Sequence, residues 1–480
     1  MLTLLLGLSL LAVPATVHGQ TIPSGLVWLR YLGGTGVDDV ASIALDGQGG
    51  LWLTGTTSDP STWQTGAITP MRIGQGGTGD VFVARVNSTG DLTLLVFIGG
   101  QGADSASGLA STPGGGVVVV GTTGSADFPV TSGVVQQRLR GRANAFLIKL
   151  GAAGNLEWAT FLGGREYDRG LATAVMADGS VVAGGSTSSP DFPAVNPLQP
   201  PGPAMQDDGF LAVLSPDATS LSFATHLGGT SGLDEVRDVA VDGQGNIIAV
   251  GATGSADFPV TRAYQGSFGG GFLTCGGDAF ITKLSWPSAQ VSFSTYLGGD
   301  GSDTGESVAV DGSGHVTVAA GTASSNFPTV PGSYAGPPGP ENMFVTRMAA
   351  DGSRLLFSSR LPVPGSPTPA CMLPPQGLRV RLDRDARSWA VGSTSASTFP
   401  VVNPLQAGLR GPSDGFLSAL SSDGSQLEFS TFLGGAGADA LRDVAISPAG
   451  AVFVAGTPNR RTCPPRRVRI AAVAMYSSRG

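Results

Sequence analysis

The sequence predicts an all-β repeat protein, and three observations lead to that prediction. The pair Gly-Gly recurs at residues 33–34, 99–100, 163–164, 228–229, 298–299 and 434–435, at intervals of 64 to 70 residues and a last interval of 136. Short runs of Val, Ile, Leu and Phe alternate with turns rich in Gly, Asp and Pro. Asp outnumbers Glu by 29 to 6, and Asp favours turns whereas Glu favours helices.

Each repeat unit contains four segments with the character of strands. In residues 236–297, "VRDVAV" and "IIAVGAT" flank the turn "DGQGN", and "DAFITKL" and "QVSFSTYL" flank "SWPSA". Both pairs are predicted hairpins, joined by a long loop. Four antiparallel strands per repeated unit are typical of a blade of a β-propeller. The last interval holds a degenerate unit with "RLPVPGSP" at its Gly-Gly position, so we predict a seven-bladed β-propeller.

A column of alanines supports this architecture. Six residues after the Asp that follows Gly-Gly, the regular units all have Ala: Ala44, Ala110, Ala174, Ala240, Ala309 and Ala445. The first strand of a propeller blade faces the central channel, where the blades converge and space is smallest. The alanines are therefore predicted to face the channel.

The two ends of the repeat array are each incomplete, which predicts how the ring closes. Residues 26–32 form a fourth strand without the three that should precede it, and residues 441–457 supply a first and a second strand. Pairing them in one last blade would remove open sheet edges. The propeller is thus expected to cover 20–457. The Arg/Pro-rich tail 458–480 departs from the repeat, although "VRIAAVAMY" can serve as an improvised third strand.

The N-terminus and the charge indicate where the chain acts. An apolar run in residues 2–13, followed by small residues, predicts a secretory signal peptide at 1–19, and no later stretch is long and apolar enough to span a bilayer. A secreted or cell-surface location is expected. The net charge is −8, and it becomes −14 without the six Arg of the tail, so nucleic acid is not an expected partner.

The repeat text resembles a known family. The segments "SFSTYLGGDGSD", "VAVDGQGNIIAVGATGSADFPVT" and "GGDAFITKL" are similar to the SBBP-type bacterial β-propeller repeat, and the resemblance covers residues 26 to 457. It implies an exported, cell-surface or extracellular propeller. It implies no reaction, because the family has none assigned.

Acidic residues recur at the end of the blades where the unit-to-unit connections and the long loops are expected to open. The main column is Asp38, Asp104, Asp168, Asp234, Asp303 and Asp439. Further acids open the third strands, with Asn144 and Asn342 at two of these positions. An acidic face could bind a cation, with Ca²⁺ the natural candidate. The favoured interpretation is that each Asp accepts hydrogen bonds from backbone N–H groups of a tight turn, so no metal or other cofactor is assigned.

Residues for catalysis are sparse. His18 lies in the predicted signal peptide, and neither His226 nor His315 has an evident Ser or Cys partner. The "F-P" pairs of the long loops, from Phe128 to Phe399, are predicted to anchor each loop against its blade.

The favoured function is a monomeric binding or scaffold module for an unidentified extracellular protein or carbohydrate, because the long loops vary most between units. Two alternatives stay open. One is an extracellular polysaccharide hydrolase acting across the acidic face. The other is a fragment of a larger adhesin.

Overall fold

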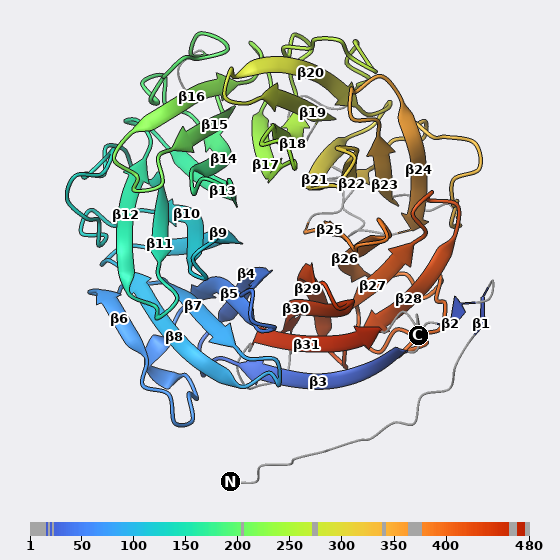
Figure 1. Ribbon diagram of the computed structural model, residues 1–480, viewed down its shortest axis with the longest axis horizontal. Coiled ribbons are helices and arrows are strands. Elements are labelled where there is room, and N and C mark those ends of the chain that lie inside the picture. The colour runs from blue at the N-terminus through green and yellow to red at the C-terminus, as the bar shows by residue number, and fades with distance from the viewer. Residues whose placement is uncertain are drawn as a thin grey trace.

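The computed structural model describes residues 16–17, 20–21, 24–202, 206–270, 277–337, 342–362, 377–459 and 468–475. In these ranges the chain forms β-strands and one 3-10 turn, η1 (Pro60–Thr62). All strands but β1 and β2 build a ring of sheets, with β4, β9, β13, β17, β21, β25 and β29 at the inner edges (Figure 1). Each sheet takes the name of its inner strand.

Six sheets of the ring have four antiparallel strands each. From the inner edge outward they are β9 (Asp104–Ser111), β10 (Val117–Thr123), β11 (Asn144–Leu150), β12 (Leu156–Leu162); β13 (Asp168–Val175), β14 (Val181–Thr187), β15 (Asp208–Leu214), β16 (Leu221–Leu227); β17 (Asp234–Val241), β18 (Ile247–Thr253), β19 (Asp278–Ser285), β20 (Gln290–Leu297); β21 (Asp303–Val310), β22 (Val316–Thr322), β23 (Asn342–Met348), β24 (Leu355–Pro362); β25 (Arg379–Leu382), β26 (Ser388–Thr394), β27 (Asp414–Leu420), β28 (Leu427–Leu433); and β29 (Ala438–Ile446), β30 (Ala451–Asn459), β31 (Val468–Met475), β3 (Ser24–Leu32). The all-β propeller class and the four-stranded blade are confirmed.

The remaining sheet of the ring differs from the prediction. It contains β4 (Asp38–Leu45), β5 (Leu51–Thr57), β7 (Asp80–Val86) and β8 (Leu92–Gly99), and a fifth strand, β6 (Met71–Gly74), pairs parallel with β8. The prediction of seven four-stranded blades was therefore wrong for this sheet, because part of its long loop folds back onto the outer strand.

The predicted ring closure is confirmed. β3 pairs antiparallel with β31, and β31 pairs with β30, so the first regular strand of the chain completes the last sheet. β31 lies within the Arg/Pro-rich segment 458–480 and provides the third strand there. Figure 1 shows β3 in blue beside β31 in red.

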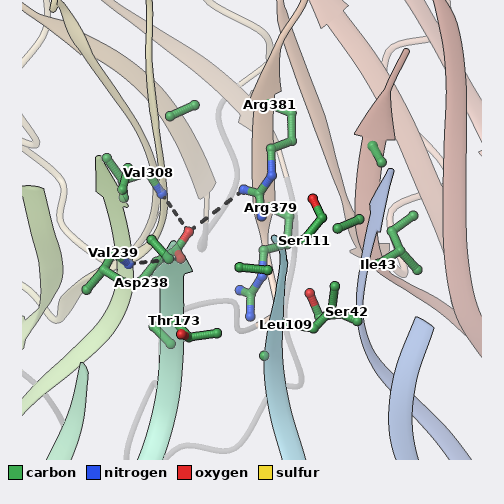
Figure 2. Close-up of a pocket in the computed structure, with 18 of the residues that line it drawn as sticks. Ser42, Ile43, Leu109, Ser111, Thr173, Asp238, Val239, Val308, Arg379 and Arg381 are labelled. Atoms are coloured by element: carbon green, nitrogen blue, oxygen red, sulfur yellow. Dashed lines mark hydrogen bonds and ion pairs between the residues drawn. The ribbon is translucent and has the colours of Figure 1, made fainter. Parts of the chain in front are cut away.

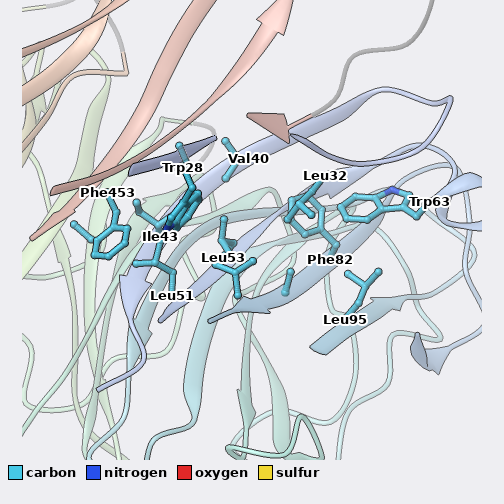
Figure 3. Close-up of a cluster of buried hydrophobic side chains, with 14 of the residues drawn as sticks. Trp28, Leu32, Val40, Ile43, Leu51, Leu53, Trp63, Phe82, Leu95 and Phe453 are labelled. Atoms are coloured by element: carbon cyan, nitrogen blue, oxygen red, sulfur yellow. The ribbon is translucent and has the colours of Figure 1, made fainter. Parts of the chain in front are cut away.

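A hydrophobic cluster joins the β29 sheet to the β4 sheet across what we call the closing seam (Figure 3). Trp28 of β3 lies 6.1 Å, centroid to centroid, from Phe453 of β30, and both belong to one buried cluster with Leu51 and Phe82. The Trp28 indole N–H also donates to the Ser88 carbonyl at 2.9 Å. Burial of two large aromatic rings here indicates that closure is supported by packing as well as by the strand ladder.

The Phe residues of the long loops behave as predicted. Phe128, Phe192, Phe258, Phe327 and Phe399 are buried, and each ring lies 4.3–4.8 Å from the Phe of the third strand of its own sheet. Each loop is thus anchored to its own sheet through this Phe.

The remaining predictions on the chain ends are only partly covered by the structure. Of the predicted signal peptide, only β1 (Thr16–Val17) lies in the described residues, where it pairs with β2 (Gln20–Thr21). Over the described ranges, no helix has the length and apolar character that crossing a membrane requires.

Candidate functional site

The six Asp of the main acidic column lie at the start of the inner strands and are buried. Their exposed fractions are at most 6%. In the β9 sheet, Thr123 pairs with both Asp104 and Asn144, so the long loop that follows Thr123 opens beside the starts of the first and third strands. The long loops and the unit-to-unit connections therefore open at the same end of the propeller, as predicted. The six carboxylates, however, are buried rather than exposed on that end.

Each of these carboxylates accepts a backbone hydrogen bond from its own turn. The donor is the N–H of the second Gly of the Gly-Gly pair, at 2.5–2.8 Å; the donors are Gly34, Gly100, Gly164, Gly229, Gly299 and Gly435. Ser hydroxyls add a second bond, for example from Ser324 to Asp303 at 2.7 Å. The turn hydrogen bonds predicted for these Asp are thus present.

At three seams, the contacts where consecutive sheets pack together, a second acidic side chain approaches from the third strand of the preceding sheet; over Gly99 this is Asp80 beside Asp104. A Cβ added to Gly228 would lie 2.7 Å from an oxygen of Asp208 and 2.7 Å from an oxygen of Asp234. Gly298 is enclosed in the same way by Asp278 and Asp303. The first Gly of the pair is therefore needed because two acidic side chains meet over its Cα.

These carboxyl pairs hold protons at a higher pH than usual. Burial, with the charge of Asp303 as a further cause, raises the pKa of Asp278 to about 7. Burial raises the pKa of Asp234 and of Asp303 to about 6, with the neighbouring Asp208 contributing at Asp234. The Oδ1 atom of Asp278 is buried without a hydrogen-bond partner among the described residues. Asp278, and to a smaller extent Asp234 and Asp303, therefore keep a bound proton at a pH at which an exposed Asp is ionised.

The β9–β13 seam has an amide in place of the second carboxyl. Asn144 occupies the third-strand position there, and its amide Nδ2 donates to Asp168 Oδ2 at 2.8 Å. An amide supplies this N–H at every pH, whereas an Asp at the same position can donate only when protonated.

A glutamine that was not predicted from the sequence completes three of these seams. Gln136, Gln265 and Gln406 of the long loops each donate to the Asn or Asp that opens the third strand, at 2.6–3.1 Å. Each also accepts from the N–H of the first Gly of the pair, at 3.1 Å. The signal was a Gln recurring in loops of unequal length, as in "AYQGSF" and "PLQAGL".

Neither histidine of the propeller forms a nucleophile–base pair. His226 Nδ1 lies 3.1 Å from Asp208 Oδ2 inside a seam, and His315 Nδ1 lies 2.9 Å from Asp311 in a hairpin turn. Across the described ranges, no three His, Cys, Asp or Glu side chains are grouped closely enough to hold a metal ion.

The alanine column lines a central channel, as predicted. The cavity has a volume of about 510 Å³, and all six alanines belong to its wall. Two arginines of β25 interrupt this wall. Arg381 stands where the other units have Ala, and Arg379 precedes it by two positions. Neither arginine was predicted to lie here, although "RVRL" in place of "SVAV" in the degenerate unit was the available signal.

The two arginines differ in their partners (Figure 2). Arg381 reaches Asp238 at 3.8 Å and Asp443 at 3.6 Å, and these two charges raise the pKa of its guanidinium despite burial. Arg379 Nη1 donates to the carbonyls of Glu306 at 3.1 Å and Leu378 at 3.0 Å. Asp443 also accepts from Ser42 Oγ at 2.7 Å, which joins the inner edges of the closing seam.

Comparison with known proteins gives no family and no activity. No protein-family model and no curated protein matches the chain. Among solved structures, a protein of unknown function from Dyadobacter fermentans has 8% identity and a TM-score of 0.43, with 94% of this chain and 99% of that chain covered. The polysaccharide lyase Uly1 has 8% identity, a TM-score of 0.42 and 88% coverage of both chains. A gluconolactonase from Xanthomonas campestris has 13% identity and a TM-score of 0.32, covering 98% and 99%. Likeness at this level transfers no activity.

Proposed function

We propose that this chain is an exported binding module that recognises an extracellular carbohydrate or protein on the end of the propeller where the long loops open. The observation that supports this proposal is a set of exposed apolar residues at one structural position. Val37, Tyr167 and Leu233 directly precede Asp38, Asp168 and Asp234, and their exposed fractions are 48%, 46% and 56%. We call these three residues the rim set.

The rim set contrasts with the acids next to it. The carboxylates are buried in the seams, whereas the preceding side chains project to solvent. Exposed apolar groups rimmed by polar loops mark interaction sites. A Tyr ring also offers a flat apolar face with a polar tip, which suits the C–H face of a sugar, so a polysaccharide is the ligand we favour.

The test is affinity electrophoresis of the protein through gels that contain dextran, xylan or alginate. We expect retardation by at least one of them, reduced in a triple variant, Val37→Ser with Tyr167→Ser and Leu233→Ser. Tyr31→Ser is the matched control, because Tyr31 is 47% exposed on β3 at the outer edge of the ring. Equal retardation of the triple variant and the wild type would reject the rim set as the binding surface.

The same samples separate binding from hydrolysis. A hydrolase would release new reducing ends from the retained polysaccharide, and a binding module would not. We favour binding because the acids proposed for the hydrolase are buried and hydrogen-bonded in their turns. Export rests on the predicted signal peptide and is tested by fusing residues 1–19 to a reporter that is active only outside the cytoplasm.

A further inference from the structure

The central channel contains a cationic side chain that the repeat architecture does not account for. Features that recur in every unit follow from the symmetry of the scaffold, whereas Arg379 and Arg381 occur in one sheet only. At the position of Arg379 the other inner strands have Ser42, Gly108, Ala172, Asp238, Ser307 and Asp443, which are small or acidic. The channel is therefore asymmetric in charge and in size of side chain.

The other arginines of the channel wall are matched by carboxylates. Arg237 lies 2.9 Å from Glu235 and 2.6 Å from Glu306. Arg381 lies between Asp238 and Asp443. Among the described residues, no carboxylate lies within 4.0 Å of the Arg379 guanidinium, whose hydrogen bonds to Glu306 and Leu378 end on neutral carbonyls through Nη1 alone.

The surroundings of Arg379 suit a small polar ligand. Ser111 brings a hydroxyl into the same cavity, and the alanine methyls form much of its wall (Figure 2). Ser42 and Thr173 also line it, but their hydroxyls already donate to Asp443 at 2.7 Å and to the Val182 carbonyl at 2.9 Å. Small-molecule sites are typically cavities of roughly 300–1,000 Å³, and the channel of about 510 Å³ is of that size. A guanidinium fork matches the two oxygens of a carboxylate.

We propose that the central channel binds a small organic carboxylate, held by the free edge of the Arg379 guanidinium with its hydroxyls facing Ser111. An acidic monosaccharide has this chemistry. This site is distinct from the rim set, since Arg379 lies on the inner strand β25 inside the channel.

The test is isothermal titration calorimetry of the full chain with glucuronate, with glucose as the neutral analogue and with inorganic phosphate as an anion without the organic part. We expect saturable binding of glucuronate alone. The variant Arg379→Gln should weaken it at least about tenfold, the usual cost of losing a charge-assisted hydrogen-bonded pair. Arg384→Gln is the matched control in the same sheet, because that side chain is 61% exposed in the adjoining turn.

A second variant covers the case in which Arg379→Gln does not fold. Ala110→Phe narrows the channel from the β9 sheet and leaves Arg379 itself unchanged, and it should abolish glucuronate binding. Unchanged affinity in either folded variant would overturn the proposal. So would equal binding of glucose, binding of phosphate without glucuronate, or no saturable binding to the wild type. Retention of polysaccharide by the rim set is unaffected by any of these outcomes, so the two proposals fail separately.

Discussion

The closing seam and the other contacts between consecutive sheets, which we call the ordinary seams, supply a hydrogen-bond donor to a buried Asp through different groups. At every seam except β21–β25, a buried Asp lies at the start of an inner strand and needs a hydrogen-bond donor. At the closing seam the indole N–H of Trp63 donates to Asp38 at 2.9 Å. At the β9–β13 seam the amide of Asn144 donates to Asp168. At the β13–β17 and β17–β21 seams the facing group is another carboxyl, of Asp208 or Asp278.

The identity of the group facing the buried Asp therefore decides how each seam responds to pH. A Trp or Asn partner satisfies the buried carboxylate permanently. An Asp partner does so only while a proton is bound, because two ionised carboxylates repel each other in a medium of low dielectric constant. The closing seam is also the one that must join distant parts of the chain, and there a hydrophobic cluster adds to the polar contacts.

The largest expected effect is at the closing seam. Deleting residues 1–32 removes β3 with Trp28 and Leu32, and truncation of a buried Trp alone costs about 3–5 kcal/mol. Because β31 pairs with both β30 and β3, deleting 460–480 also detaches β3. We expect both deletions to abolish the cooperative thermal transition, since the loss approaches the total stability of a domain, about 5–15 kcal/mol.

Deletion of residues 1–23 is the control for both truncations, because it leaves β3 intact, and its melting temperature should stay close to that of the full chain. From the sequence alone, deleting 458–480 is expected to destabilise the ring less than deleting the N-terminal strand, because the tail departs from the repeat. The pairing of β31 reverses that expectation. A C-terminal deletion that melts like the full chain would show that β3 does not depend on β31.

An intermediate effect is expected at an ordinary seam. Gly228→Ala places a Cβ 2.7 Å from oxygens of both Asp208 and Asp234, so the two sheets must move apart. Overpacking of this kind costs about 1–3 kcal/mol. Chemical denaturation should show that loss, whereas Gly243→Ala, where a Cβ would meet nothing within 4 Å, should change little. Equal stability of the two variants would mean that the seam tolerates the extra carbon.

The ring, its closure, the alanine wall and the Phe anchors could be predicted because each rests on a spacing that recurs in the sequence. Burial of Asp234 or Asp303 could not, since a side chain at a strand start becomes buried only when the preceding sheet covers it. Gln265 could not be predicted either, because the loops that contain the equivalent Gln residues differ in length and show no fixed spacing. Arg379 lies in the degenerate unit, and β6 has no counterpart in the other sheets. Neither could be predicted from a recurring pattern.

The smallest expected effect is a dependence of stability on pH that distinguishes the seams. The pKa of Asp278 is raised from the ordinary value of 3.8 to about 7 in the folded protein. A group with a raised folded pKa contributes stability that is fully present below its unfolded pKa and is lost as pH rises through the folded value. The melting temperature of the wild type should therefore fall between pH 5 and pH 8, through loss of these bound protons.

Exchanging the seam chemistry tests this reasoning in both directions. Asp278→Asn supplies the permanent amide found at Asn144, so its melting temperature should fall less between pH 5 and pH 8. Asn144→Asp creates a new carboxyl pair with Asp168, whose own pKa burial already raises, so its melting temperature should fall more. One unit of pKa shift corresponds to about 1.4 kcal/mol, and since the two carboxyls of a pair are coupled we expect each exchange to change the difference between the two pH values by on the order of 1 kcal/mol. If both variants keep the pH profile of the wild type, the carboxyl pairs do not hold these bound protons, and the Asp and Asn seams are equivalent.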